Sequence, residues 1–248
     1  MANPIPLSEL PVLQSDNFEQ FSEEMYQKGS VILMDKPLDW SSFDLVKFAR
    51  NRLPVKKVGH AGTLDPLATG LLILCTGKAT KSISQIQNLE KEYVATIKFG
   101  ESTASYDAAM EPDNTAPWQH ITEKAVLDVI KTNFTGEIEQ KPPKYSALKV
   151  GGRRMYDLAR KGKEIEINPR PVVIREIEVL EMILPEIIVR VQCGKGTYIR
   201  SLAHDLGLAL NSLGHLTALR RTKTGHFDVQ YALTPDVFNS FIKSKQDG

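Results

Sequence analysis

An aspartate in a glycine-rich stretch has the surroundings of a residue that could do chemistry. Asp65 belongs to Gly59-His-Ala-Gly-Thr-Leu-Asp-Pro-Leu-Ala-Thr-Gly70, whose glycines permit a tight backbone path and close approach to a ligand. Pro66 disfavours the right-handed helical conformation at Asp65, so we expect an extended, outward-facing carboxylate. A carboxylate presented in this way could act as a nucleophile or accept a proton. An aspartate that merely caps a turn before proline would have the same spacing.

A second motif, Gly194-Lys-Gly-Thr-Tyr198-Ile-Arg200, follows an expected strand and opens an expected helix. Free backbone N–H groups and the helix dipole point toward whatever binds at such a position. Arg200 lies in the first turn, and an arginine within ion-pair reach would hold an aspartate ionised and oriented. The alternative is that Arg200 is a surface charge and Tyr198 an aromatic residue of the core.

Three further features have both a functional and a structural interpretation. His60 has no second ligand or carboxylate near it in sequence, which is weak evidence for metal or acid–base chemistry, but in a nucleic-acid enzyme it could fill the gap left by an extruded base. Tyr93 could stack on a base or face the core. The segment Lys144-Tyr-Ser-Ala-Leu-Lys149-Val-Gly-Gly-Arg-Arg154-Met-Tyr mixes basic and aromatic residues, which suits phosphate contact with stacking.

The net charge of +1 conceals an uneven distribution of charge. Basic residues gather between Lys141 and Lys163, opposed only by Asp157, and again between Arg190 and Lys223, opposed only by Asp205. A protein can bind phosphates with one basic face and stay near neutral overall. The alternative is that each run is simply a solvated face.

Apolar periodicity predicts the elements that must position these groups. Strands are expected at 31–34, 71–75, 93–99, 172–184, 186–192 and 216–222, and helices at 41–53, 80–89, 122–134, 153–160, 197–210 and from Thr234 onward. Strands and helices do not alternate strictly, so we predict an α+β (mixed α/β) fold with a largely antiparallel mixed sheet flanked by helices. Residues 1–29 are expected to form an arm, 30–248 one domain, and 100–118 a polar, turn-rich segment.

Composition narrows the class of protein. Apolar residues make up 42% of the chain and charged residues 25%, as in ordinary globular proteins. No apolar run approaches the roughly 20 residues that span a bilayer, and no secretory leader is evident, so a cytoplasmic protein without membrane contact is expected. Cys75 and Cys193, in apolar contexts, indicate core residues rather than a disulfide or metal site.

Taken together, the motifs resemble those of the TruB-type tRNA pseudouridine-55 synthases. The resemblance runs from about Val31 to about Phe238. The matching stretches are Asp35-Lys-Pro37, the Gly59–Gly70 stretch, Lys144-Tyr-Ser-Ala-Leu-Lys149, Gly194-Lys-Gly-Thr-Tyr-Ile-Arg200 and Leu219-Arg-Arg221. It implies the catalytic fold of pseudouridine synthases for residues 30–248. Many members carry a further RNA-binding domain of the PUA type, and none is expected here.

The resemblance also implies roles for individual residues. Asp65 would be the nucleophile and Arg200 its partner, while Tyr93 would stack on the target base and move a proton late in the reaction. His60 would take the space of the flipped uridine. Tyr198 and Leu219 would line the same pocket. We expect the phosphate contacts with RNA in the basic segments 141–163 and 217–223, at residues that include Lys149, Arg153, Arg154 and Arg220. Lys36 and Pro37 would support the active-site loop.

The implied reaction is the isomerisation of uridine 55 in the T loop of tRNA. It involves no redox change and no energy input, so no cofactor and no metal are expected. The partner would be the T arm stem-loop of tRNA, recognised largely by shape, with no obligate protein partner. Two alternatives remain open: an RNA-binding tRNA folding chaperone in which catalysis is secondary or lost, and a related synthase that depends on a guide RNA.

Overall fold

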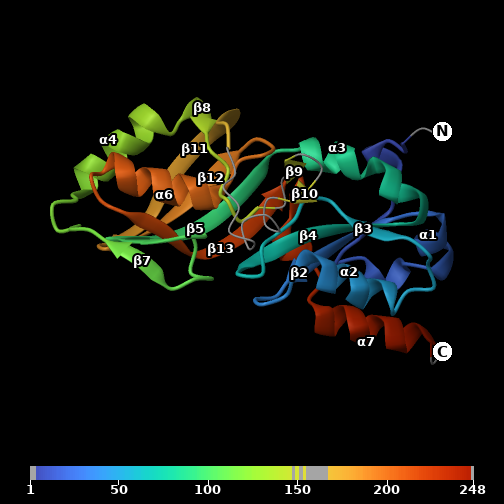
Figure 1. The fold of residues 1–248 in the computed structure, drawn as a ribbon. Coiled ribbons are helices and arrows are strands. Elements are labelled where there is room, and N and C mark those ends of the chain that lie inside the picture. Colours follow the sequence, from blue (N-terminus) through green and yellow to red (C-terminus); the bar gives the residue numbers. More distant parts are fainter. Residues whose placement is uncertain (1–3, 147–148, 151–152, 155–166, 247–248) are drawn as a thin grey trace. The chain divides into compact units, whose positions relative to one another are not determined.

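The computed structural model describes residues 4–146, 149–150, 153–154 and 167–246, and the chain divides into two compact units (Figure 1). Unit 1 comprises Met1–Tyr93 and Arg220–Gly248, and unit 2 comprises Val94–Leu219. Two strands, β5 (Lys91–Phe99) and β13 (Gly214–Thr224), pass from one unit into the other. The strands pair mostly antiparallel, with the first two strands parallel to each other, and helices flank them, which confirms the α+β class expected from the sequence.

The strands of unit 1 run in the order β1-β2-β4-β13, with β3 beside β4 and β14 beside β13. Their bounds are β1 Val12–Leu13, β2 Val31–Lys36, β3 Val58–His60, β4 Ala68–Thr76 and β14 Phe227–Asp228. β2 and β3 both lie antiparallel to β4. Every residue of β4 from Leu71 to Thr76 is buried, as a strand covered on both faces must be.

Short helices and turns surround these strands. They are η1 Leu7–Glu9, η2 Phe18–Gln20, α1 Glu23–Lys28, α2 Ser42–Arg50, η3 Gly77–Ser82, α3 Ile83–Asn88, η4 Val229–Tyr231 and α7 Pro235–Gln246. α2 begins with the capping box that the sequence predicts, in which Ser41 and Asp44 each bind the other's backbone N–H. Leu45, Val46 and Ala49 form its buried face.

The described residues of the expected N-terminal arm are part of unit 1. β1 pairs with β2 in parallel, with Val12 opposite Val31. Leu10 and Leu13 are buried, with 6% and 0% of their surface exposed. The segment therefore covers the edge of the unit-1 strands, and its apolar residues are too few and too widely spaced in sequence to have predicted this.

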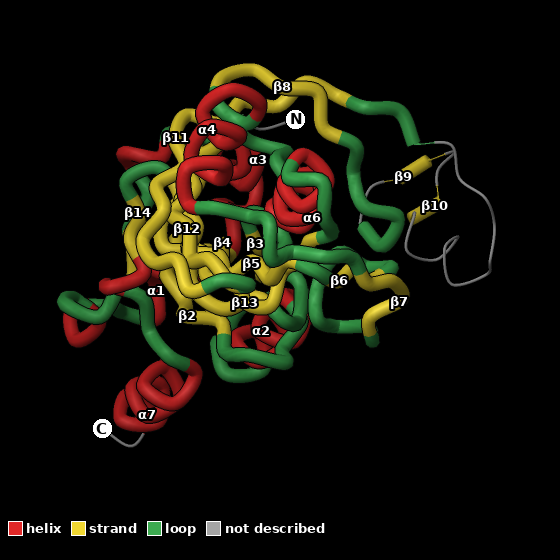
Figure 2. The backbone as a smooth tube through the Cα atoms, turned by 90° about the vertical axis from the view of Figure 1, so that its left-hand side faces the viewer, coloured by secondary structure: helices red, strands yellow, loops and turns green. Residues whose placement is uncertain are grey.

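The strands of unit 2 run in the order β5-β12-β11-β8, and two further pairs, β6 with β7 and β9 with β10, stand outside that order (Figure 2). Their bounds are β6 Glu101–Thr103, β7 Pro112–Thr115, β8 Gly136–Gln140, β9 Lys149–Val150, β10 Arg153–Arg154, β11 Arg170–Ile183 and β12 Glu186–Cys193. The helix predicted for 153–160 is wrong at its start, because Arg153 and Arg154 form β10. Residues 155–160 lie outside the described residues.

Two helices of unit 2, α4 (Glu123–Asn133) and α6 (Ile199–Ala209), lie against each other, and α4 also contacts β11 (Figure 1). On α6, Leu202 and Leu206 are each 1% exposed, which confirms the predicted core spacing. Among the described residues, no helix has both the length and the apolar character needed to cross a membrane.

A close approach of backbones fixes α6 against the start of β13. A Cβ atom built at Gly207 would lie 2.3 Å from the backbone nitrogen of Gly214 and 2.4 Å from the carbonyl carbon of Leu213. Only glycine leaves room for this contact, and the contact sets the position of the helix that carries Arg200.

We therefore expect Gly207→Ala to lower the free energy of unfolding by about 2 kcal/mol, because the overlap is with backbone and no side-chain rotation relieves it. This cost exceeds the gain of about 1 kcal/mol in helix propensity. Urea denaturation measures the change. Leu208→Ala, at a neighbouring position that is 50% exposed, is the control and should change stability by less than about 1 kcal/mol. Equal stability of Gly207→Ala and the unmodified protein would contradict the packing argument.

Candidate active site

The loop that carries Asp65 connects β3 with β4, and a buried serine holds it from one side. Ser42, 3% exposed, opens α2. Its Oγ accepts a hydrogen bond from the Leu64 N–H at 2.8 Å and donates one to the Leu64 carbonyl at 2.9 Å. Both polar groups of the residue before Asp65 are thus bound by one hydroxyl, and Asp65 itself is half-buried.

A buried lysine holds the same loop from the other side of Asp65. Lys36 is 0% exposed, and its Nζ donates to the carbonyls of Trp40 at 2.5 Å, Pro37 at 2.8 Å and Pro66 at 3.3 Å. Burial lowers the pKa of Lys36 to about 8, and the charge of Asp65 opposes that shift. The expectation that Lys36 and Pro37 support the loop is consistent with these contacts, and the ammonium lies within electrostatic range of the Asp65 carboxylate.

A buried arginine from β13 completes the support of the loop. Arg221 is 1% exposed, and it donates from Nε to the Leu71 carbonyl at 2.7 Å and from a terminal nitrogen to the Gly62 carbonyl at 3.2 Å. Gly70 has a φ of 97°, and a Cβ there would lie 2.3 Å from the Arg221 carbonyl oxygen. The close passage of β13 therefore requires glycine at this end of the loop.

Two other predicted site residues belong to unit 1. His60 ends β3 and is half-buried, and burial lowers the pKa of its imidazole. The nearby Arg221 lowers this pKa further, while a hydrogen bond with the Gly62 backbone opposes the shift. Tyr93 lies on β5 with 9% of its surface exposed. The hydrogen bond with the Gly62 backbone links His60 to the loop of Asp65, and Tyr93 belongs to the same unit.

Arg220, predicted to bind RNA, forms a bidentate ion pair with Asp35 at 2.7 and 3.0 Å. Its side chain is 41% exposed. Arg220 and Asp35 line a cleft of about 420 Å³ in unit 1, together with Lys36, Pro37, Trp40, Thr69, Thr234, Pro235 and Asp236. One predicted phosphate contact is therefore already partly engaged by a carboxylate.

Unit 2 supplies the second predicted motif. The side-chain amide of Gln140, itself 1% exposed, accepts from the Tyr198 N–H at 2.8 Å and donates to the Tyr198 carbonyl at 3.0 Å. This fixes the residue before α6, so that Arg200 enters the helix in a defined position. Arg170 lies over the Tyr198 ring at 5.0 Å and donates to the Gly196 carbonyl at 2.9 Å.

Arg200 is buried in unit 2, and oxygen atoms of three residues meet its guanidinium. It donates to the carbonyls of Ser105 at 3.0 Å and Tyr145 at 2.9 Å, and its Nε lies 3.5 Å from a carboxylate oxygen of Asp107. The surface-charge alternative for Arg200 is therefore wrong. Asp65 belongs to unit 1, so its pairing with Arg200 stays a prediction.

Asp107 is a residue that sequence reasoning missed. It is 4% exposed and accepts from the Ser105 hydroxyl at 2.6 Å and the Ala109 N–H at 3.1 Å. It lies in the 100–118 segment, where β6 and β7 also lie, although the composition predicted only a polar, turn-rich stretch. A buried partner for Arg200 leaves no local signal, because the arginine lies far along the chain.

The remaining predicted residues also lie in unit 2. Leu219 is half-buried near the middle of β13. Lys149, Arg153 and Arg154 belong to the β9–β10 pair, in which Arg154 stands opposite Lys149. Their role in binding RNA stays a prediction. Among the described residues, no group of three or more His, Cys, Asp or Glu side chains is arranged to hold a metal ion.

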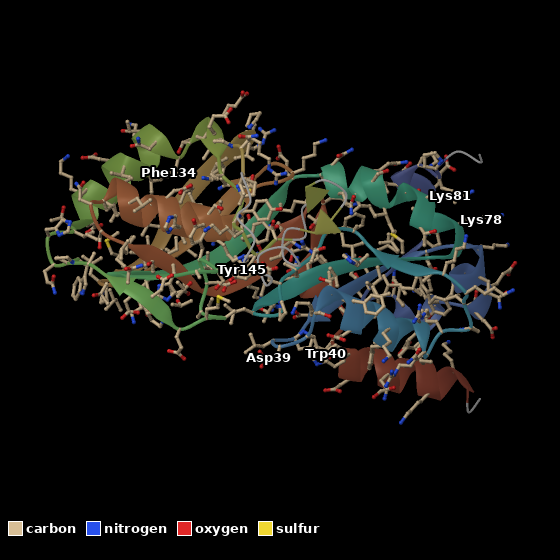
Figure 3. All side chains as sticks on the ribbon, viewed as in Figure 1. Asp39, Trp40, Lys78, Lys81, Phe134 and Tyr145 are labelled. Carbon is tan, nitrogen blue, oxygen red and sulfur yellow. The ribbon has the colours of Figure 1, made fainter. Side chains whose placement is uncertain are left out.

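Unit 1 carries a basic surface, which we call the lysine surface: Lys56, Lys57, Lys78 and Lys81. All four are exposed, and Figure 3 labels Lys78 and Lys81 along η3. The Gly77 N–H donates to the Lys57 carbonyl at 3.0 Å, which joins the two pairs. The only acidic residue between 51 and 89 is Asp65. Sequence reasoning missed this surface because its two halves lie far apart in the chain.

Comparison with known proteins identifies the family to which this chain belongs. A model of the TruB family pseudouridylate synthase N-terminal domain matches residues 50–199, and one of the tRNA pseudouridylate synthase B C-terminal domain matches residues 200–246. The tRNA pseudouridine synthase B of Bacteroides fragilis is 54% identical over 223 residues, which cover 88% of this chain and 95% of that protein. The enzyme of the same name from Flavobacterium johnsoniae is 52% identical over 227 residues, covering 89% and 99%.

Solved structures agree in fold. The archaeal box H/ACA sRNP Nop10–Cbf5 complex matches with 28% identity and a TM-score of 0.68, covering 93% of this chain and 60% of the solved one. A Cbf5–Nop10–Gar1 complex matches with 30% identity and a TM-score of 0.69, covering 98% and 63%. The chain thus spans about three-fifths of those solved chains.

The serine contact yields a test. Ser42→Ala leaves the N–H and carbonyl of Leu64 without their hydroxyl partner, so the free energy of unfolding should fall by about 1–3 kcal/mol. Urea denaturation is again the measurement. Ser84→Ala, the same change at an exposed position on α3, is the matched control and should stay within about 0.5 kcal/mol of the unmodified protein. If the two variants were equally stable, the hydroxyl would not be holding the loop.

Proposed function

The chain belongs to the TruB family of pseudouridine synthases, and from that premise we propose that it isomerises uridine 55 in the T loop of tRNA, with Asp65 as nucleophile. By family it is a tRNA pseudouridine synthase, an isomerase. One observation carries the assignment of Asp65. Buried side chains bind the backbone immediately before and after it, through Leu64 and Pro66, so the carboxylate is presented from a fixed loop.

The reaction rearranges one nucleotide without adding or removing atoms. The bond between N1 and C1′ of uridine breaks, a bond between C5 and C1′ forms, C5 loses its proton, and N1 ends with one. A carboxylate serves three routes: attack at ribose C1′, attack at C6 of the ring, or removal of the C2′ proton. All three begin with an ionised Asp65 against an extruded nucleotide, and extrusion costs a few kcal/mol that stacking and phosphate contacts offset.

The other residues take supporting roles in this proposal. Tyr93 stacks on the base and moves a proton late in the reaction, and Arg200 holds the Asp65 carboxylate ionised and oriented. His60 fills the space that the uridine leaves in the stack. Its imidazole is half-buried with a lowered pKa, and an uncharged ring suits a place among stacked bases. Tyr198 and Leu219 line the pocket.

The RNA partner is proposed to be the T arm stem-loop of tRNA. The lysine surface supports this, because its exposed cations lie beside the start of β3, whose last residue is His60. Lys149, Arg153, Arg154 and Arg220 would add further phosphate contacts. The structural relatives include a protein in an H/ACA RNP bound to a substrate RNA, but identity to the curated tRNA enzymes is higher, 54% against 29%. This favours a stand-alone tRNA enzyme over one that depends on a guide RNA.

Asp65→Asn should abolish pseudouridine formation while tRNA binding is retained, because the amide keeps the shape of the side chain and loses its charge and nucleophilicity. Release of tritium from C5 of labelled uridines measures turnover, and mapping pseudouridine in the product measures the position. Full activity of this variant would refute the nucleophile assignment. Pseudouridine at a position other than 55 in the product of the unmodified enzyme would refute the proposed target.

The lysine surface can be tested by its salt dependence. Lys78→Gln with Lys81→Gln should weaken tRNA binding and reduce the slope of log K against log salt by about 1–2, as expected for the loss of one or two phosphate contacts. Lys124→Gln with Lys131→Gln makes the same charge change on α4 and is the control, expected to leave the slope near that of the unmodified protein. Equal slopes for the two double variants would place the RNA contact elsewhere.

A further inference from the structure

The turn before Asp107 contains a tyrosine in an unfavourable backbone conformation. Tyr106 has a φ of 63°, in the left-handed region that bulky side chains rarely adopt. Its N–H donates to the Thr103 carbonyl at 3.0 Å, and its carbonyl accepts from the Leu216 N–H at 3.0 Å. The next residue along the chain is Asp107, which pairs with Arg200. The direction in which Asp107 points therefore depends on keeping Tyr106 in this conformation.

The ring of Tyr106 stacks on the ring of His204. The ring of His204 lies 3.9 Å from that of Tyr106, with only 8° between the two planes. Among the described residues, the buried Nδ1 of His204 has no hydrogen-bond partner, and burial lowers the pKa of the imidazole. The imidazole therefore offers Tyr106 a flat, uncharged ring, and its Nδ1 makes no hydrogen bond to the described residues.

The stack and the ion pair join the same two segments. Arg200 and His204 are four residues apart on α6, so they project from the same face one turn apart. Their partners, Asp107 and Tyr106, are adjacent in the 105–107 turn, and the Ser105 carbonyl also accepts from Arg200. α6 therefore contacts this turn at two points, through the Arg200–Asp107 ion pair and through the His204–Tyr106 stack.

We propose that His204 is a positioning residue for catalysis: by stacking on Tyr106 it holds the left-handed turn that aims Asp107 at Arg200. The stack keeps the guanidinium in one orientation, and Arg200 in turn orients the reactive carboxylate. This last step rests on the proposed function. In this proposal His204 acts only through Tyr106 and Asp107 and takes no chemical step itself.

The test compares two substitutions that differ in whether they keep the stack. His204→Ala removes it, and kcat on tRNA should fall about 10- to 100-fold with KM nearly unchanged, as for a misplaced catalytic group. His204→Phe keeps a flat ring and leaves no polar group of its own unpaired, so it should restore most of kcat. Leu208→Ala, on the exposed part of the same helix, is the control. All rates are taken well below the melting temperature of each variant.

A double-mutant cycle tests the path through Asp107. In an Asp107→Asn background, His204→Ala should cost little further rate, because the contact that the stack maintains is already broken. Full additivity of the two losses would overturn the proposal. So would full kcat in His204→Ala, or a His204→Phe variant as slow as His204→Ala.

An activity-independent readout separates this inference from the proposed function. The ¹⁵N-labelled Arg200 Nε–H resonance, assigned with Arg200→Lys, should be sharp in the unmodified protein, broadened or shifted in His204→Ala, and restored in His204→Phe. An unmodified enzyme inactive on tRNA would refute the function, yet the resonance would still decide the role of His204. An Arg200 resonance identical in all three proteins would overturn the role of His204 even if the enzyme is active.

Discussion

A cation that is buried away from water needs oxygen atoms to accept its hydrogen bonds, and this requirement fixes the loop around Asp65. Lys36 and Arg221 are almost wholly buried, and the carbonyls that receive their hydrogen bonds include those of Pro66 and Gly62, after and before Asp65. A shift of the loop would therefore cost each of these buried cations one of its carbonyl partners. The position of the Asp65 carboxylate therefore depends on the hydrogen bonds of Lys36 and Arg221, two residues to which we assign no chemical step.

Unit 2 uses the same device for Arg200. The carbonyls of Ser105 and Tyr145 and the carboxylate of Asp107 meet its charge inside the unit, while Gln140 fixes the backbone just before the helix. A guanidinium with several oxygen partners is held in one orientation, as a group that must direct an anion requires. In both units, then, backbone carbonyls accept the hydrogen bonds of buried cations that water would otherwise accept. These hydrogen bonds hold rigidly the segments that carry the groups assigned to catalysis.

Features governed by neighbouring residues were predictable. The capping box of Ser41 and Asp44, the buried spacing of Leu202 and Leu206 on α6, and the strand after the glycine-rich loop all follow from rules that act over a few residues. The short N-terminal strand β1 did not follow, because it exists only through pairing with β2. The lysine surface was not predictable either, because its two pairs come together only through the hydrogen bond between Gly77 and Lys57.

The sequence by itself determined which groups are available for chemistry: the carboxylate of Asp65 within a glycine-rich stretch and the guanidinium of Arg200 at the start of a helix. Only the tertiary structure decided what holds them. Ser42 reaches Leu64 across 22 residues, and the Ser105 carbonyl meets Arg200 across 95. Such contacts leave no periodic or local pattern, because hydroxyls, carbonyls and carboxylates occur throughout any chain and acquire a partner only when folding buries them together.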